Sequence, residues 1–185
     1  MREEIRFSGS GGQGLITAAR ILAKTAILDQ KNALQSQTYG AEARGGSTKS
    51  EVIIADEKIY FPEVEIPDLV ILMTQEAYNK YHAIIHENGN MVIDSFMIKE
   101  FNENPKCRIY TKPFTGYAEH EFHSKILANM LITGFVVGLL LEIITIESYS
   151  IALEDFFSGE KLEKNILAAR FGYDLATKDK PIHFS

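Results

Sequence analysis

Apolar positions along the chain follow two patterns, short runs typical of strands and longer stretches with helical spacing. The run at 5–8 predicts a strand, and Leu15–Leu28, with apolar residues three or four apart, predicts a helix. Residues 68–73 are almost entirely apolar, as expected of a strand covered on both faces. Further strands are predicted at 32–37, 91–94 and 107–110, and further helices at 75–87, from 119 onward, at 149–157 and at 162–176.

Strands that alternate with helices favour an α/β fold. We expect a Rossmann-like, three-layer arrangement: a mostly parallel sheet with helices on both faces and a helical C-terminal region. Residues 51–55 and 58–61 flank Asp56-Glu57 and predict a hairpin. No repeat, low-complexity tract or linker interrupts the pattern, so residues 1–185 are predicted to form a single domain.

Residues 126–141 form a sixteen-residue run without a charge. A membrane span normally needs about 20 predominantly apolar residues, so this run is better read as a buried central helix. Gly134 and Gly138 lie four residues apart within it, a spacing that lets another helix approach closely.

Composition and charge narrow the possible functions. The chain is 45% hydrophobic, enough for an ordinary core, and its formal charge of −6 argues against gripping nucleic-acid phosphates. Its one cysteine, Cys107, cannot form an internal disulfide or hold an iron–sulfur cluster alone, and we expect a small buried residue. The N-terminal residues lack the pattern of a secretory signal, so a cytoplasmic location is expected, with no nucleic-acid or membrane partner.

The predicted first strand and helix are joined by a glycine-rich loop. Gly9, Gly11 and Gly14 fit the pattern GxGxxG, with Gly12 and Gln13 between them. Such glycines permit a tight turn, and the bare N–H groups at the start of the helix can bind an anion. The alternative is a tight turn that holds no ligand.

A dinucleotide site also needs an acidic residue at the end of the second strand, to bind the ribose hydroxyls. Asp29 precedes that strand, and its end offers only Gln35, Ser36 and Gln37. The missing acid counts against an NAD-dependent dehydrogenase. The remaining interpretation is that the glycine-rich loop faces a phosphate group or a neighbouring chain.

A second loop, at 35–46, combines glycines with two charged side chains. The Arg44 guanidinium can clamp a phosphate or carboxylate through two hydrogen bonds. Alternatively, Glu42 and Arg44 pair to shape the loop or to bind a neighbouring chain. The candidate binding residues of this loop are Tyr39, Gly40, Glu42, Arg44, Gly45 and Gly46.

Together the two loops resemble the gamma subunit of the 2-oxoacid:ferredoxin oxidoreductases, the pyruvate, ketoisovalerate and 2-oxoglutarate family. The resemblance covers nearly the whole chain and continues through 60–63, 67–68, 74–78, 93–95, Asn129-Met130, Asn165, Ala168 and Gly172. Ala41 stands where the family has proline, which loosens the loop without removing its charges. The Glu-Ala-Arg-Gly-Gly form is most similar to the 2-oxoglutarate branch.

This resemblance implies an enzyme that decarboxylates a 2-oxoacid with thiamine diphosphate, passes electrons through iron–sulfur clusters to ferredoxin and releases an acyl-CoA. The chain has no Gly-Asp pair and one cysteine, so alpha and beta subunits are expected to hold thiamine diphosphate and Mg²⁺, and a ferredoxin-like subunit the clusters. The chain is expected to be inactive alone, with no catalytic residue of its own, and its two loops to contact coenzyme A or the partner subunits. The alternatives are a free-standing nucleotide-binding oxidoreductase and a non-catalytic scaffolding module.

The remaining polar residues have structural explanations. His82 and His86 lie four apart on a predicted helix, but no third ligand accompanies them, so a solvated helix face is expected rather than a metal site. His120 and His123 are assigned to the start of a helix. Asp94 ends a predicted strand, where it either faces a ligand or caps the next helix.

Overall fold

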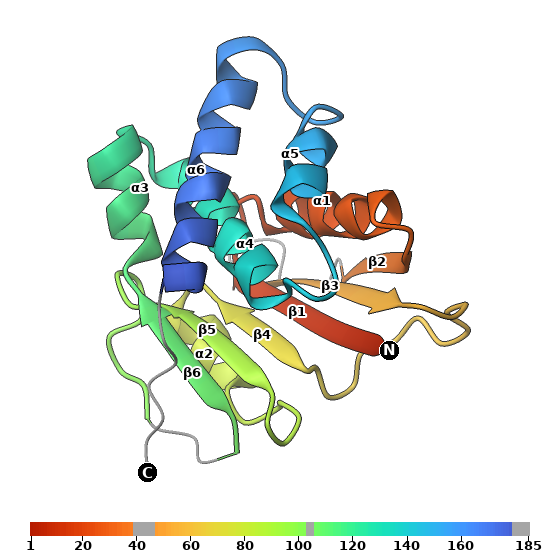
Figure 1. The fold of residues 1–185 in the computed structure, drawn as a ribbon. Helices are drawn as coiled ribbons and strands as arrows, with labels where there is room; N and C mark the ends of the chain where they lie inside the picture. The colour runs from red at the N-terminus through yellow and green to blue at the C-terminus, as the bar shows by residue number, and fades with distance from the viewer. Residues whose placement is uncertain (39–46, 103–105, 179–185) are drawn as a thin grey trace.

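The computed structural model describes residues 1–38, 47–102 and 106–178, and its strands form one six-stranded sheet (Figure 1). The strands are β1 (Arg2–Ser10), β2 (Asn32–Thr38), β3 (Ser47–Ala55), β4 (Leu69–Leu72), β5 (Asn90–Asp94) and β6 (Arg108–Lys112). Their order across the sheet is β2-β3-β1-β4-β5-β6. Strands β1, β4, β5 and β6 are parallel, and β3 runs against both of its neighbours. The predicted, mostly parallel α/β sheet is confirmed.

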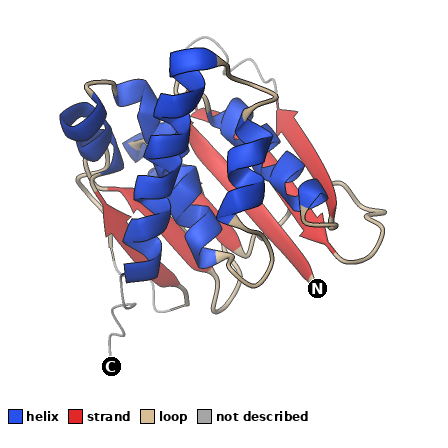
Figure 2. Ribbon diagram, turned by 45° about the horizontal axis from the view of Figure 1, so that its top comes forward, coloured by secondary structure: helices blue, strands red, loops and turns tan. Residues whose placement is uncertain are grey.

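Helices cover both faces of this sheet, but unequally (Figures 1 and 2). The helices are α1 (Leu15–Leu28), α2 (Gln75–Tyr81), α3 (Phe114–Phe122), the 3₁₀ turn η2 (Lys125–Leu127), α4 (Ala128–Leu139), α5 (Ile146–Leu153) and α6 (Gly159–Lys178). Helix α2 lies on one face and the other helices lie on the opposite one. The three layers expected from the sequence are therefore present.

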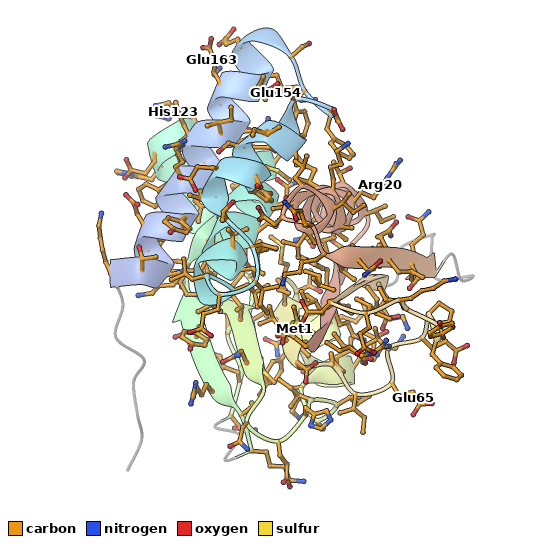
Figure 3. All side chains as sticks on the ribbon, turned by 45° about the vertical axis from the view of Figure 1, so that its right-hand side comes forward. Met1, Arg20, Glu65, His123, Glu154 and Glu163 are labelled. Carbon is orange, nitrogen blue, oxygen red and sulfur yellow. The ribbon has the colours of Figure 1, made fainter. Side chains whose placement is uncertain are left out.

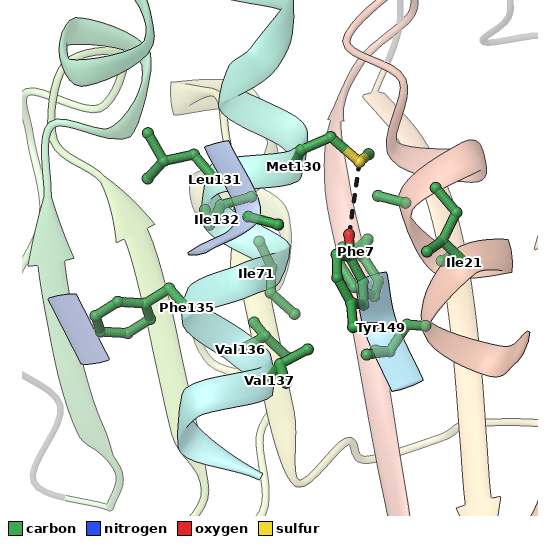
Figure 4. Packing of buried hydrophobic residues seen from close by; sticks show 14 of the residues in the cluster. Phe7, Ile21, Ile71, Met130, Leu131, Ile132, Phe135, Val136, Val137 and Tyr149 are labelled. Atoms are coloured by element: carbon green, nitrogen blue, oxygen red, sulfur yellow. Dashed lines mark hydrogen bonds between the residues drawn. The ribbon is translucent and has the colours of Figure 1, made fainter. Parts of the chain in front are cut away.

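The alternation of side chains along β1 separates the two faces of the sheet. Ile5 and Phe7 point into the larger hydrophobic cluster, beneath α1, α4 and α5, where the Tyr149 hydroxyl also donates to the Met130 sulfur at 3.5 Å (Figure 4). Arg6 points to the other face, where its guanidinium lies over the Tyr81 ring. The smaller cluster packs α2 against β4 and β5.

Helix α4 is the buried central helix that the sequence predicts. All of its residues from Ala128 to Gly138 are buried. A Cβ atom at Gly134 would overlap the backbone carbonyl of Ala169, so α4 and α6 pack backbone against backbone. Within the described residues, no helix is long and apolar enough to cross a membrane.

The predicted hairpin between 51–55 and 58–61 is wrong. Strand β3 lies between β1 and β2, with Glu51 opposite Arg6 on one side and Ser36 on the other. Both of its edges are thus hydrogen-bonded, which leaves no edge for a strand at 58–61. These residues instead form an irregular connection from β3 to β4.

Several predicted helix boundaries also differ. Helix α2 begins where the Thr74 hydroxyl accepts from Ala77 N–H, but it ends at Tyr81 rather than at 87. The chain turns there because Ile85 packs into the cluster beneath α2. Helix α3 begins at Phe114 rather than at 119, and α5 ends at Leu153 rather than at 157.

Candidate functional site

The connections that leave the neighbouring strands β1 and β4 turn to opposite faces of the sheet, which makes this a topological switch point. The chain leaves β1 for α1 on one face of the sheet and leaves β4 for α2 on the other. Ser8 and Leu72 are paired in the parallel register between the two strands, and Met73 N–H donates to the Ser8 carbonyl at 3.0 Å. Open α/β sheets bind ligands in the crevice at such a point.

The glycine loop lies at this switch point and is held by the side chain of Gln13. Its Oε1 accepts from Ser10 N–H at 2.8 Å, and its Nε2 donates to the Met73 carbonyl at 3.2 Å. Gly12 and Gly14 have φ angles of 87° and 74°, a left-handed conformation that favours glycine. The loop is therefore tied to the ends of both β1 and β4.

The backbone of the loop is accessible to a ligand. A Cβ atom would meet nothing within 4 Å at Gly12, and at Gly11 only the Thr48 hydroxyl, 3.9 Å away. Gly14 precedes α1 without a side-chain cap, and Ala18 N–H donates to its carbonyl at 3.0 Å. N–H groups before Ala18 have no partner within the helix, so they can bind an anion.

Two hollows lie beside this loop, and Ile126 of η2 contributes to the lining of both. The first, here called the switch-point crevice, has a volume of about 290 Å³. Its lining comprises Ser10, Gly12, Gln13, Met73, Met97, Thr115, Lys125, Ile126 and Ala128. The Lys125 ammonium lies 3.2 Å from the Glu119 carboxylate and over the Phe96 ring.

The second hollow, here called the α6 cavity, has a volume of about 750 Å³, in the range of small-molecule pockets. Phe122, Leu127 and Phe157 supply much of its apolar wall. Lys161 and Lys164 contribute ammonium groups from α6, and Gly14 and Thr17 contribute the start of α1. No pattern in the sequence pointed to these lysines, because α6 comes from the far end of the chain.

Asp94 caps a helix, the second of the two roles considered for it. The buried carboxylate accepts from Thr115 N–H at 3.1 Å and from its hydroxyl at 2.5 Å, at the start of α3. The other oxygen accepts from Phe96 N–H at 3.1 Å. Burial raises the pKa of Asp94, against these hydrogen bonds, which lower it.

The predicted binding residues of the second loop, Tyr39, Gly40, Glu42, Arg44, Gly45 and Gly46, lie outside the described residues. The strands on either side are described. Strand β2 ends at Thr38, and β3 begins at Ser47, which pairs with Ser10 at the end of β1. Both ends of segment 39–46 thus lie at the sheet edge that carries the glycine loop.

The sheet order strengthens the case against a dinucleotide site. In such a fold the second strand neighbours the first, which brings the acidic residue to the ribose. Here β3 separates β2 from β1, and Gln35 donates to the Ser50 hydroxyl of β3 at 2.9 Å. The Asp29 carboxylate accepts from Thr145 N–H at 2.7 Å and from the Ser148 hydroxyl at 2.5 Å, so it anchors the start of α5.

The histidines have roles other than those expected. His82 and His86 are not on one helix, since α2 ends at Tyr81, and the His82 ring stacks on Tyr78 at 4.7 Å. His123 ends α3, with φ 52°, rather than beginning a helix. Among the described residues, no three His, Cys, Asp or Glu side chains are placed to hold a metal ion.

Cys107 is half-buried in the turn before β6, and burial raises the pKa of its thiol.

Fold and site together define a Rossmann-like α/β protein with an accessible glycine loop at its switch point. The family model for pyruvate ferredoxin/flavodoxin oxidoreductase matches residues 4–175, and the chain belongs to this family. The family resemblance seen in the sequence is thereby confirmed. Relatives in this family are subunits of larger oxidoreductases, so this chain too has partner subunits.

Relatives of similar length match nearly the whole chain. The 2-oxoglutarate synthase subunit KorC of Methanocaldococcus jannaschii is 42% identical over 179 residues, covering 95% of each chain. The pyruvate synthase subunit PorC of the same organism is 33% identical, covering 92% of this chain and 95% of that one.

Solved structures share the fold. The keto/oxoacid ferredoxin oxidoreductase gamma subunit of Geobacter sulfurreducens PCA has a TM-score of 0.85 and 35% identity, covering 95% of this chain and 97% of that one. The 2-oxoglutarate:ferredoxin oxidoreductase of Magnetococcus marinus, with 2-oxoglutarate, coenzyme A and succinyl-CoA bound, has a TM-score of 0.87 and 24% identity, which shows the fold alone. The match covers 97% of this chain but 32% of that one, so the shared fold is about a third of that longer chain.

Proposed function

We propose that this chain is the gamma subunit of a 2-oxoglutarate:ferredoxin oxidoreductase. In this role it supports the CoA-dependent oxidative decarboxylation of 2-oxoglutarate to an acyl-CoA, with electrons passed to ferredoxin. The choice of 2-oxoacid rests on a comparison with two subunits of the same organism, Methanocaldococcus jannaschii. This chain is 42% identical to its 2-oxoglutarate synthase subunit and 33% identical to its pyruvate synthase subunit.

The redox chemistry belongs to the partner subunits in this proposal. An iron–sulfur cluster takes four thiolates, whereas this chain has one cysteine, so a ferredoxin-like subunit carries the clusters. The chain has no Gly-Asp pair, so alpha and beta subunits carry thiamine diphosphate and Mg²⁺. The chain supplies no catalytic residue, and we place the whole complex in the cytoplasm, as the sequence leads us to expect.

We also propose that the two loops receive part of coenzyme A. The donor chemistry fits phosphate groups: Gly11 and Gly12 leave the loop backbone open, and Lys125 adds an ammonium group in the switch-point crevice. Gly9 and Gln13 hold the loop in shape, Gly14 begins α1, and the Arg44 loop starts from the same sheet edge. Bound coenzyme A supplies the thiol that takes the acyl group, and the residues of this chain only bind and orient it.

The experiment uses the intact complex, purified anaerobically from co-expressed subunits. Ferredoxin reduction is followed with 2-oxoglutarate, pyruvate and 2-oxoisovalerate, and 2-oxoglutarate is expected to give the highest kcat/KM. Arg44→Ala is expected to raise the KM for coenzyme A about tenfold, the worth of one charge-assisted contact, while kcat stays the same. An unchanged KM in an intact complex rules out the coenzyme A role for Arg44, and a complex that falls apart assigns the loop to subunit contacts.

A further inference from the structure

The connection from β3 to β4 exposes two neighbouring aromatic rings. Tyr60 and Phe61 are 75% and 77% exposed, more than any other large apolar side chain in the described part of the chain. Ile66, later in the same connection, is 50% exposed. Aromatic rings gain much free energy on burial, so an exposed pair marks a contact surface rather than a contribution to the fold.

The backbone that carries these rings is tied to the sheet at several points. At its start, the Asp56 carboxylate accepts from the N-terminal amino group at 2.8 Å and from Lys31 at 2.7 Å. The Arg2 guanidinium donates to the Phe61 carbonyl at 3.2 Å. The buried Arg6 guanidinium donates to the Val64 carbonyl at 2.6 Å. The rings are thus presented on a pre-organised backbone, which lowers the entropy lost on binding.

Three of the four charged residues at 57–66 are acidic, and the nearby Arg2 guanidinium is paired with Glu4 at 2.7 Å. Glu57, Glu63 and Glu65 are exposed, and none of the three forms an ion pair with another described residue. Figure 3 shows Glu65 at the periphery of the molecule. The one basic side chain between 57 and 66, Lys58, lies over the Tyr60 ring. A complementary partner therefore has a basic rim around an apolar pocket.

The part of this connection that carries Tyr60 and Phe61 is tied to the opposite end of β1 from the glycine loop. It is tied to Met1 and Arg2, whereas the glycine loop follows Ser10. Arg2, which binds the Phe61 carbonyl, and Ser10 are eight residues apart along β1, or about 26 Å at about 3.3 Å per residue. A protein bound to the aromatic rings leaves the switch-point crevice open.

We propose that residues 57–66, here called the aromatic segment, are the docking surface for one partner subunit of the oxidoreductase. This rests on the proposed function, which supplies the partner subunits. Tyr60 and Phe61 anchor in an apolar pocket of that subunit, and Glu57, Glu63 and Glu65 face lysine or arginine side chains around the pocket. A second copy of this chain is a poor occupant, because two acidic segments repel each other.

The test compares complexes purified anaerobically from co-expressed subunits. In the double variant Tyr60→Ser/Phe61→Ser, the Kd for the partner subunits is expected to rise about 30-fold or more, as for a hot spot. The matched control, Ile27→Ser/Ile151→Ser, changes two other apolar side chains, each 54% exposed, and is expected to shift the Kd less than threefold. Circular dichroism is expected to show that each variant folds, since all four side chains are more than half exposed.

Two further variants test the chemistry of the partner. Glu63→Lys/Glu65→Lys is expected to weaken binding about tenfold at low salt and to reverse its salt dependence. A photo-crosslinking amino acid at position 60 is expected to label a partner peptide that contains lysine or arginine. Unchanged affinity of the aromatic variant, or crosslinking only to a second copy of this chain, overturns the proposal. Binding is measured from the mass of the complex, independently of activity. A complex that assembles but does not oxidise a 2-oxoacid therefore refutes the proposed function and leaves the docking proposal standing.

Discussion

The side-chain amide of Gln13 occupies the space in which any other residue at position 9 would carry its Cβ atom. A Cβ at Gly9 would overlap Gln13 Oε1 and lie 2.9 Å from the Leu15 Cδ1 atom. The first glycine of the GxGxxG pattern is thus needed for packing within the loop. A Cβ at Gly11, by contrast, would meet only the Thr48 hydroxyl, at 3.9 Å, so a methyl group there projects toward a ligand rather than into the fold.

Gly9→Ala is expected to lower the free energy of unfolding by about 1–3 kcal/mol, the usual penalty of overpacking. Gly11→Ala serves as the matched control and is expected to change it by less than about 0.5 kcal/mol. Urea denaturation measures both. In the assembled complex, the Gly11 variant is also expected to raise the KM for coenzyme A. Equal stability losses in the two variants would contradict this account of the loop.

Gly134→Ala is expected to separate α4 from α6. The new methyl group would overlap the carbonyl group of Ala169, and backbone atoms cannot turn aside as a flexible side chain can. A loss of about 2–4 kcal/mol in the free energy of unfolding is expected, together with a lower Tm. A loss below 0.5 kcal/mol, the usual range of surface substitutions, would show that the two helices are not in backbone contact.

Arg6→Met is expected to destabilise the protein through the carboxylate that it leaves behind. The Arg6 guanidinium lies 2.7 Å from Glu51, and both side chains are buried. Removing one partner of a buried ion pair costs about 3–5 kcal/mol in the free energy of unfolding. The cost here is expected to be smaller, because the Lys49 ammonium lies 3.2 Å from Glu51 and still pairs with it. The double variant Arg6→Met/Glu51→Leu is expected to recover most of the loss in urea denaturation. A double variant less stable than Arg6→Met would contradict the explanation.

Stability is expected to fall as the pH rises from about 4.5 to about 7 because of Glu3. Burial, and then the nearby Asp68 carboxylate, raise the pKa of Glu3 from 4.5 to about 7. Between these two values the folded state binds a proton that the unfolded state has lost, so the stability present below pH 4.5 is lost as the pH rises to about 7.

Glu3→Gln is therefore expected to stabilise the protein at pH 8 by about 1 kcal/mol, since solvent screens a partly exposed carboxylate, and to have little effect at pH 4.5. Urea denaturation at both pH values measures this. Asp56 does not interfere, because its pKa is lowered to about 2 by its bonds to Lys31 and to the N-terminal amino group. A stability difference between variant and wild type that is the same at both pH values would contradict the assignment to Glu3.

Local patterns predicted those elements whose causes are local. Helix α1 matches its predicted limits, Leu15 and Leu28, because apolar spacing and the glycine turn set both of them nearby. The apolar run around Gly134 likewise predicted a buried helix in close contact with another. The glycine loop could be located because its pattern is contiguous.

Elements governed by distant residues could not be predicted in the same way. The start of α3 depends on Asp94, which is 21 residues before Thr115 in the sequence. The position of β3 depends on pairing with β1 and β2 at once, and this pairing excluded the predicted hairpin. Lys161 reaches the α6 cavity only through the packing of α6 against α4, which no short motif records.

The most direct test of the central claim is an anaerobic affinity purification of this chain from its native cells, with mass spectrometry and with thiamine and iron assays. The chain is expected to be recovered with thiamine-binding and cluster-bearing subunits, and the recovered complex is expected to oxidise 2-oxoglutarate in a reaction that depends on coenzyme A. Recovery of the chain alone, with neither cofactor nor partner, would contradict the claim.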